Sequence, residues 1–283
     1  MILAMMSWGV AWTNAKIVNQ YMSYTNLVFL RYISSFIFLL PLILLRKKRI
    51  KAPDTPTLIN IISVSFLYYL YNIFFFYGTD IGDAGFGGVF VTTTNPIVTF
   101  LLIAAIAWKI NRYQLLGILI GFVGGCIILN IFQDGLTAFT VKENLSFIAC
   151  SLTWGVITVV MSHGQKDYDS MSYIVLCYFI TALIASVFIN PSELLSIQNY
   201  DSWFFLNFFF VSIGAMAFGT SIYMYSAPRL GPVQTSVFIF SVPFIAMSTA
   251  HYVLGEQITI NIVAGGFLSL VAIYLVNREH LHK

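Results

Sequence analysis

The chain has 283 residues, of which 59% are hydrophobic and only 9% are charged. An ordinary soluble domain carries roughly 45–50% apolar and about 25% charged residues, so this composition excludes a water-soluble globular fold. The formal net charge of +3 is too small and too scattered to indicate binding to nucleic acid. The three cysteines lie in apolar stretches without metal-ligand spacing, which predicts no disulfide, structural zinc or other cofactor: Cys126, Cys150 and Cys177.

Ten apolar segments follow one another between short interruptions rich in charge, Pro, Gly, Asn or Asp. A transmembrane helix needs about 20 such residues. Helices are favoured over a β-barrel because the runs are continuous and do not alternate with polar residues. The first segment has no charged leader or cleavage site, so we expect a span there and not a signal peptide. The sequence predicts an all-α polytopic membrane protein with helices over residues 1–21, 25–45, 57–78, 84–107, 113–132, 145–163, 171–189, 203–226, 232–253 and 259–277.

Basic residues predict how these segments are oriented, because cytoplasmic loops carry an excess of Lys and Arg. If both termini are cytoplasmic, the outer loops hold only Lys142, while Lys16 and Arg31 fall within predicted spans. The other eleven basic residues then lie on the inner side, which predicts cytoplasmic termini: Arg46, Lys47, Lys48, Arg49, Lys51, Lys109, Arg112, Lys166, Arg229, Arg278 and Lys283.

The second half of the chain repeats landmarks of the first. A Trp-Gly pair at Trp8 recurs at Trp154, 146 residues later, and Pro96 of the fourth segment is matched by Pro243 of the ninth at an offset of 147. These offsets predict two five-helix repeats, residues 1–132 and 145–277. Because five is odd, the second repeat must enter the membrane from the opposite side. Such inverted repeats are typical of secondary transporters, which place their binding site at the membrane midplane.

Charge inside the predicted spans has one sign. All eleven acidic residues lie in loops or at span ends, whereas Lys16 and Arg31 lie inside the first two segments. A buried cation costs about 2.5–3.5 kcal/mol on insertion, so it must face water, backbone carbonyls or an anionic group. Arg31 is therefore a binding residue for an anionic solute, or a structural residue that ties carbonyls at a broken helix. Lys16 either joins such a site or extends its amine to the outer headgroups.

Aromatic and amide side chains form stripes at helical spacing. Trp8, Trp12 and Lys16 are four residues apart and share one face of the first helix, which indicates an aromatic wall leading to a cation. In the third segment, Tyr68 and Asn72 lie on a stripe that suits an amphipathic solute, with rings for apolar contact and an amide for orientation. The alternative for both stripes is ordinary packing between helices, with an interhelical hydrogen bond from the amide.

Pro96 and Pro243 each remove a backbone hydrogen-bond donor inside a predicted span, and polar residues such as Asn95 precede them. This pattern predicts a shared midplane site beside flexing elements, or else two static kinks stabilised by hydroxyl groups. Glycine runs in the fifth and tenth segments predict close helix contact: Gly117, Gly121, Gly124, Gly125, Gly265 and Gly266. A dimer contact through these glycines is possible, so the chain is expected to be a monomer or a homodimer.

Several of these features together resemble the EamA type of the drug/metabolite transporter superfamily. They are the two five-helix halves, Trp-Gly near the start of each, Phe-Leu-Arg-Tyr at 29–32, the two span prolines, and Gly-Glu at 255–256. The first half departs from the pattern where Trp108-Lys109 replaces an expected Glu. The resemblance implies a carrier of the bacterial inner membrane, often an exporter of amino acids or other small metabolites. It supports five matched positions: Trp8, Arg31, Pro96, Trp154 and Pro243.

Taken together, these features predict a permease that moves a small metabolite, an amino acid or organic anion, by alternating access within the lipid bilayer. Predicted binding residues are Trp8, Trp12, Lys16, Arg31, Tyr68, Asn72, Asn95 and Trp154, and no residue is predicted to be catalytic or to bind a metal. The first alternative is a proton-driven multidrug efflux pump, which would need a titrating group such as His163 or His251. A second is an intramembrane enzyme or lipid-handling protein, although no midplane nucleophile or acid/base pair is evident in the sequence.

Overall fold

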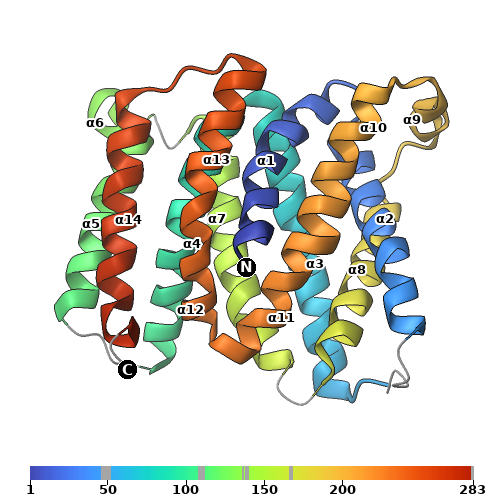
Figure 1. Ribbon diagram of the computed structural model, residues 1–283, viewed down its shortest axis with the longest axis horizontal. Helices are drawn as coiled ribbons and strands as arrows, with labels where there is room; N and C mark the ends of the chain where they lie inside the picture. Colours follow the sequence, from blue (N-terminus) through green and yellow to red (C-terminus); the bar gives the residue numbers. More distant parts are fainter. Residues whose placement is uncertain (46–51, 108–111, 136, 138–139, 166–167, 282–283) are drawn as a thin grey trace.

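Helices form all of the secondary structure that can be described. The computed structural model describes residues 1–283 except 46–51, 108–111, 136, 138–139, 166–167 and 282–283, and this part contains no strand. Figure 1 shows the helices standing side by side. The predicted all-helical membrane fold is thereby confirmed. In chain order the elements are α1 (Ile2–Asn19), α2 (Tyr24–Leu44), α3 (Thr55–Ile81), α4 (Ala84–Ala107), α5 (Arg112–Ile128), α6 (Ile131–Asp134), α7 (Lys142–Gly164), α8 (Ser170–Ser186), α9 (Pro191–Leu195), η2 (Ser196–Asn199), α10 (Ser202–Phe209), η3 (Phe210–Thr220), α11 (Ser221–Leu230), α12 (Pro232–Val237), η4 (Phe238–Ser241), α13 (Val242–Thr249), η5 (Ala250–Leu254) and α14 (Ile260–Leu281).

Five of the described helices are long and apolar enough to cross a membrane. They are α2, α3, α4, α7 and the continuous run α10–η3–α11. A sixth is α8 together with the α9–η2 segment, from which it is bent by 113°. Shorter apolar helices occupy parts of the fifth, ninth and tenth predicted segments. The chain is therefore a multi-pass membrane protein. Most of the basic residues that predict its orientation, including Lys109 and Lys166, lie outside the described residues.

Two of the long runs depart from α-helical geometry. η3 is an 11-residue π-helix, and η4 is a short 3-10 helix directly before α13, whose second residue is Pro243. Pro96, by contrast, lies inside α4, which stays helical around it. Three threonines in this stretch donate to carbonyls of the preceding turn: Thr92 to Gly88 (2.5 Å), Thr93 to Val89 (2.7 Å) and Thr94 to Phe90 (2.7 Å).

The helix pair at one end of the molecule packs with its backbones close together. Figure 1 shows α5 beside α14 at one end, α2 beside α8 toward the other, and α1, α4 and α7 between them. At the α5–α14 contact, a Cβ added to Gly124 would lie 2.8 Å from the carbonyl oxygen of Gly265, and one added to Gly265 would lie 2.6 Å from that of Gly124. The predicted close contact between the glycine runs is thus confirmed.

Acidic residues at several helix starts act as N-caps. Asp54, Asp169 and Asp201 each accept a hydrogen bond from the backbone N–H three residues later, at 2.9–3.1 Å. A carboxylate at this position satisfies an unpaired N–H group and is favoured by the helix dipole. Its bonds to Thr57 hold the pKa of Asp54 below its usual value. The structure thus explains why these acids stand at span ends.

Candidate functional site in the central cavity

A small cavity lies where α1, α2, α3, α4, α7 and η3 meet, and we call it the central cavity. Its volume of about 30 Å³ has room for one or two water molecules, so no metabolite fits unless the helices move apart. Five of the twelve residues that line it are aromatic, and one is a cation: Trp8, Ala11, Trp12, Arg31, Tyr71, Phe75, Thr92, Asn95, Trp154, Ala215, Met216 and Thr220.

Arg31 supplies the positive charge of the central cavity. Its side chain is 5% exposed, and no carboxylate of the described residues lies within 4.0 Å of it. Nε donates to the carbonyl oxygen of Val211 in η3 (3.0 Å), and Nη1 donates to Oδ1 of Asn72 (2.6 Å). The guanidinium carbon also lies 5.1 Å from the ring centre of Phe75. These bonds fix the guanidinium in place but leave its charge without a counterion.

Nη2, the second terminal nitrogen of Arg31, donates to no group of the described residues. A guanidinium that binds the protein through Nε and one terminal nitrogen keeps the donors of the other terminal nitrogen, which can bind a carboxylate or phosphate oxygen. A buried cation gains much from such a partner because the surroundings screen the interaction weakly. The chemistry of this site therefore favours an anionic group.

Asn72 positions Arg31 from behind. Its amide nitrogen donates to Oη of Tyr32 (2.6 Å) and to the carbonyl oxygen of Tyr68 (2.9 Å), so its oxygen is turned toward Arg31. Neither Asn72 nor Tyr68 lines the central cavity. Tyr68 instead packs edge-on against Trp154, with ring centres 6.0 Å apart. The residues of α3 that reach the cavity are Phe75 and Tyr71, and the Tyr71 ring lies 4.8 Å from that of Trp154.

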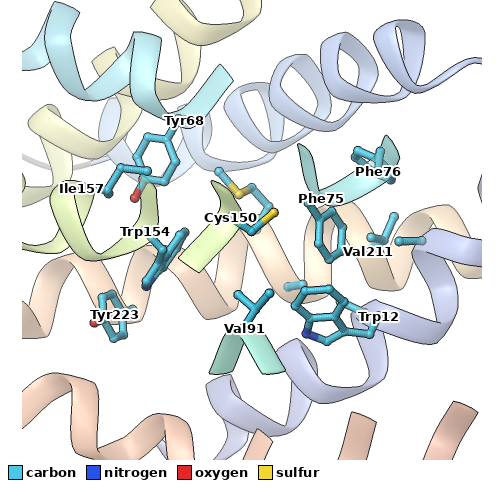
Figure 2. Packing of buried hydrophobic residues seen from close by; sticks show 14 of the residues in the cluster. Trp12, Tyr68, Phe75, Phe76, Val91, Cys150, Trp154, Ile157, Val211 and Tyr223 are labelled. Atoms are coloured by element: carbon cyan, nitrogen blue, oxygen red, sulfur yellow. The ribbon is translucent and has the colours of Figure 1, made fainter. Parts of the chain in front are cut away.

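Two tryptophans from the repeated Trp-Gly pairs meet in the wall of the cavity. The rings of Trp8 and Trp154 lie 5.0 Å apart and nearly perpendicular, and Tyr223 of α11 packs 5.0 Å from Trp8. Figure 2 shows Trp154 between Tyr68 and Tyr223. Trp8 Nε1 donates to the carbonyl oxygen of Ala215 (3.0 Å), so α1 is bonded to η3 at this level. Rings at such distances form a rigid apolar wall.

Trp12 lies one turn beyond Trp8 and covers the cavity on that side. Its ring packs against Phe75 (4.8 Å) and Phe147 (6.0 Å), and Figure 2 shows Trp12 and Phe75 facing each other. Gly88 lets α4 approach the Trp12 ring closely, because a Cβ added at Gly88 would lie 3.1 Å from that ring.

Asn95 lines the cavity from α4. Its amide group lies within hydrogen-bond reach of the carbonyl oxygens of Val91 (3.1 Å) and Ser151 (3.2 Å), to which the amide nitrogen can donate and so join α4 to α7. Pro96, the next residue, does not line the cavity, and Pro243 borders a separate apolar pocket with α14 residues. The structure therefore places Asn95 at the site and the two prolines outside it.

Lys16 lies outside the central cavity. It borders a second cavity of about 740 Å³ together with Asp83, Phe86, Glu143 and Glu256. We call this cavity the outer vestibule, because the cytoplasmic termini expected from the sequence would place it on the outer side. The Lys16 amine donates to the carbonyl oxygen of Gly82 (2.7 Å) and forms ion pairs with Glu256 (3.5 Å) and Asp83 (3.6 Å). The cation that the sequence placed beside the aromatic wall is thus already neutralised by carboxylates of the same chain.

Similarity to known proteins shows the family of this chain independently of the cavity geometry. The sequence model of the EamA-like transporter family matches residues 1–130 and again residues 141–278. The chain belongs to the EamA-like transporter family. The resemblance seen in the sequence is confirmed, and the family is one of membrane transporters.

Relatives and solved structures agree with membership of the EamA-like family. An uncharacterized transporter of Archaeoglobus fulgidus is 24% identical over 277 residues, which cover 96% of this chain and 95% of that protein. The uncharacterized transporter YoaV of Bacillus subtilis is 24% identical over 204 residues, covering 70% and 68% of the two chains. A solved structure titled "Crystal structure of protein" superposes with a TM-score of 0.70 at 14% identity and covers 99% of this chain and 96% of that one. This last likeness shows the fold alone.

In this EamA-like chain, the structure brings together five of the eight predicted binding residues: Trp8, Trp12, Arg31, Asn95 and Trp154. Asn72 does not line the cavity but accepts a hydrogen bond from Arg31, which does. Tyr68 packs against Trp154 of the aromatic wall, and Lys16 lines the outer vestibule. The sequence reasoning missed the cavity residues of η3, Ala215, Met216 and Thr220. No proline or charge marks this stretch, so the sequence carried no signal for it.

Proposed function

We propose that this chain is a secondary carrier that moves a small amphipathic carboxylate, an organic anion or amino acid, across the bacterial inner membrane by alternating access. The observation that carries the proposal is Arg31, a buried guanidinium held by Asn72 and Val211 that lines an aromatic cavity and whose Nη2 has no partner among the described residues. The carboxylate would pair with Arg31, while Trp8, Tyr71 and Trp154 would contact the apolar part of the solute.

The proposed architecture is ten spans in two inverted five-helix repeats, residues 1–132 and 145–277. Contacts between the halves support it, because they occur in pairs with the roles exchanged. Gly9 of α1 packs on Ile245 of α13, and Gly155 of α7 packs on Val98 of α4. Gly155 follows Gly9 by 146 residues and Ile245 follows Val98 by 147, the same offsets as those of the repeated sequence landmarks. The separate matches of the family model to each half also support it.

Opposite directions of matched helices support the inversion. The C-terminal part of α1, with Lys16, and the N-terminal part of α7, with Glu143, line the same outer vestibule. The two helices therefore run in opposite directions relative to the membrane. Inverted halves of this kind are the usual basis for two alternately open states around one central site. The small volume of the central cavity fits a state in which neither side is open.

Ligand binding tests the proposed substrate class. We expect 3-phenylpropionate or phenylalanine at millimolar concentration to raise the melting temperature of the purified protein, because a ligand that binds only the folded state stabilises it. Phenethylamine, which keeps the ring and lacks the carboxylate, should give no shift. The measurement is a thermal-shift series in detergent, extended to aliphatic carboxylates of graded size.

The same series contains the result that would overturn the proposal. Stabilisation by phenethylamine or other lipophilic cations, with none by any carboxylate, would favour the multidrug efflux alternative. In that case, solute movement in proteoliposomes should also acidify the lumen. If carboxylates act as expected, their uptake into proteoliposomes without ATP should show saturable exchange with solute trapped inside.

A further inference from the structure

Lys16 connects three separate elements at the vestibule end of the molecule. It stands near the end of α1, and its amine reaches Gly82 and Asp83 in the turn between α3 and α4, as well as Glu256 in the turn between η5 and α14. The side chains of Lys16 and Glu256 are 25% and 10% exposed, so water screens their ion pair only in part. One lysine thus links both halves of the chain.

Glu256 is itself held firmly in position. Its two carboxylate oxygens accept hydrogen bonds from the backbone N–H groups of Ala84 (2.9 Å) and Gly85 (2.7 Å), the first residues of α4. This arrangement caps α4 from another part of the chain and places the negative charge at the positive end of the helix. Gly255, with φ of +73°, lets the chain turn there. Lys16 therefore binds to the start of α4 through Glu256.

An aromatic layer lies between the outer vestibule and the central cavity. Trp12 and Phe75 line the central cavity, Phe86 lines the vestibule, and Phe147 contacts both Trp12 (6.0 Å) and Phe86 (5.7 Å). Lys16 stands one helical turn beyond Trp12 on the same face of α1. The outer side is thus closed twice, by packed rings and by an ion pair above them.

The repeat offers an internal comparison for this closure. At the offset of 146, Trp12 corresponds to Thr158 and Lys16 corresponds to Ser162 of α7, at the opposite side of the molecule. Thr158 shares a hydrogen bond with Tyr223 (3.2 Å). Ser162 donates to the carbonyl oxygen of Val159 (2.7 Å) and shares a hydrogen bond with the His163 ring, both in its own helix. A serine cannot form an ion pair. The matched position on the inner side therefore lacks the bond that Lys16 provides on the outer side.

We propose that Lys16 is a positioning residue of the outer gate: its ion pair with Glu256 holds α1 against the start of α4 and keeps the outer side closed above the Trp12 layer. This inference rests on the proposed transport function, because a gate has a role only in a carrier. It reassigns Lys16 from solute binding to control of access, and it implies that the ion pair must break each time the outer side opens.

Access of an impermeant reagent to the central cavity tests the gate without any substrate. Ala11→Cys places a thiol in the central cavity, where Ala11 is 3% exposed. A membrane-impermeant methanethiosulfonate reagent is added outside intact cells, and labelling of the chain without Ala11→Cys is subtracted. We expect Lys16→Met to raise the labelling rate about fivefold, the order expected for losing the partly shielded ion pairs of Lys16. Lys16→Arg should keep the rate near that of the parent.

Two further variants separate the gate from a general loss of stability or charge. Lys142→Met removes a cation from the same end of the molecule that forms none of these contacts, and it should leave labelling unchanged. Glu256→Gln should also raise labelling, and the double variant should raise it no further than Lys16→Met, because Lys16→Met already removes the Lys16–Glu256 pair. Unchanged labelling in a folded Lys16→Met protein, or additive effects in the double variant, would overturn the proposal.

The role of Lys16 in the gate and the binding of carboxylates are tested by separate measurements, so each can fail while the other holds. If no carboxylate binds yet Lys16→Met opens the cavity to the reagent, the substrate class is wrong and the gate stands. If carboxylates bind and are transported but labelling does not respond to Lys16, the carrier stands and the gate is wrong.

Discussion

Replacing Arg31 by methionine is expected to abolish transport of the carboxylate. Methionine keeps much of the apolar volume of the side chain but removes the charge and all of its donors. A hydrogen bond to a charged group contributes about 1.5–3 kcal/mol, so we expect the affinity for a carboxylate ligand to fall on the order of 10- to 100-fold. The measurement is uptake into proteoliposomes together with the ligand-dependent thermal shift. Both signals should be lost while the protein still folds.

Asn72→Ala provides a matched control for the role of Arg31. It removes the acceptor for Nη1 but leaves the guanidinium and its bond to Val211 in place. We expect weaker binding than in the parent, though stronger than in Arg31→Met, because the charge remains and only its position is less well defined. If Arg31→Met leaves both transport and carboxylate affinity unchanged, Arg31 is a structural residue of the α2–η3 contact and the proposed site is wrong.

Gly124→Ala is expected to lower the melting temperature markedly, whereas Gly125→Ala, one residue later, is expected to be neutral or stabilising. A Cβ at Gly124 would lie 2.8 Å from the backbone oxygen of Gly265, and neither backbone can yield without separating α5 from α14. Overpacking of this kind costs about 1–3 kcal/mol. At Gly125 the nearest atoms would be 3.9 Å away, so alanine gains up to about 1 kcal/mol of helix propensity at no steric cost.

The reciprocal variant Gly265→Ala should behave like Gly124→Ala, since its Cβ would lie 2.6 Å from the Gly124 oxygen. Melting curves of the four proteins in one detergent, including the parent, make the comparison. Equal melting temperatures for Gly124→Ala and Gly125→Ala would show that α5 and α14 are not in backbone contact. The α5–α14 pair does not line the central cavity, so we expect ligand affinity to be the same in every variant that folds.

The helical stripes illustrate how far the sequence predicts the site. A spacing of three and four residues identifies one face of a helix, and it correctly grouped Trp8 with Trp12 and Tyr68 with Asn72. It does not tell which edge of that face meets the cavity. Residues three apart on an α-helix differ by roughly 60° in direction, so Tyr71 reaches the central cavity and Tyr68 packs behind it.

Lys16 shows a second limit of the same reasoning. Eight residues separate it from Trp8, which is about 12 Å along an α-helix, so the sequence sets its height above the aromatic wall. Whether the wall and the lysine share one compartment depends on the rings that fill the space between them. Phe75, Phe86 and Phe147 come from α3, α4 and α7, and together with Trp12 they divide that space into two cavities.

The sequence by itself determines that the chain lies in a membrane, approximately where its helices begin and end, and that only cations stand inside the spans. Hydrophobic content, capping residues and charge are local properties, and they can be read without knowing which helices meet. The tertiary structure alone decides that Arg31 is held by Asn72 and Val211 while Lys16 is paired with Glu256. The physical reason is that a buried charge takes its role from its partners, and these partners come from other helices and turns, far away in the chain.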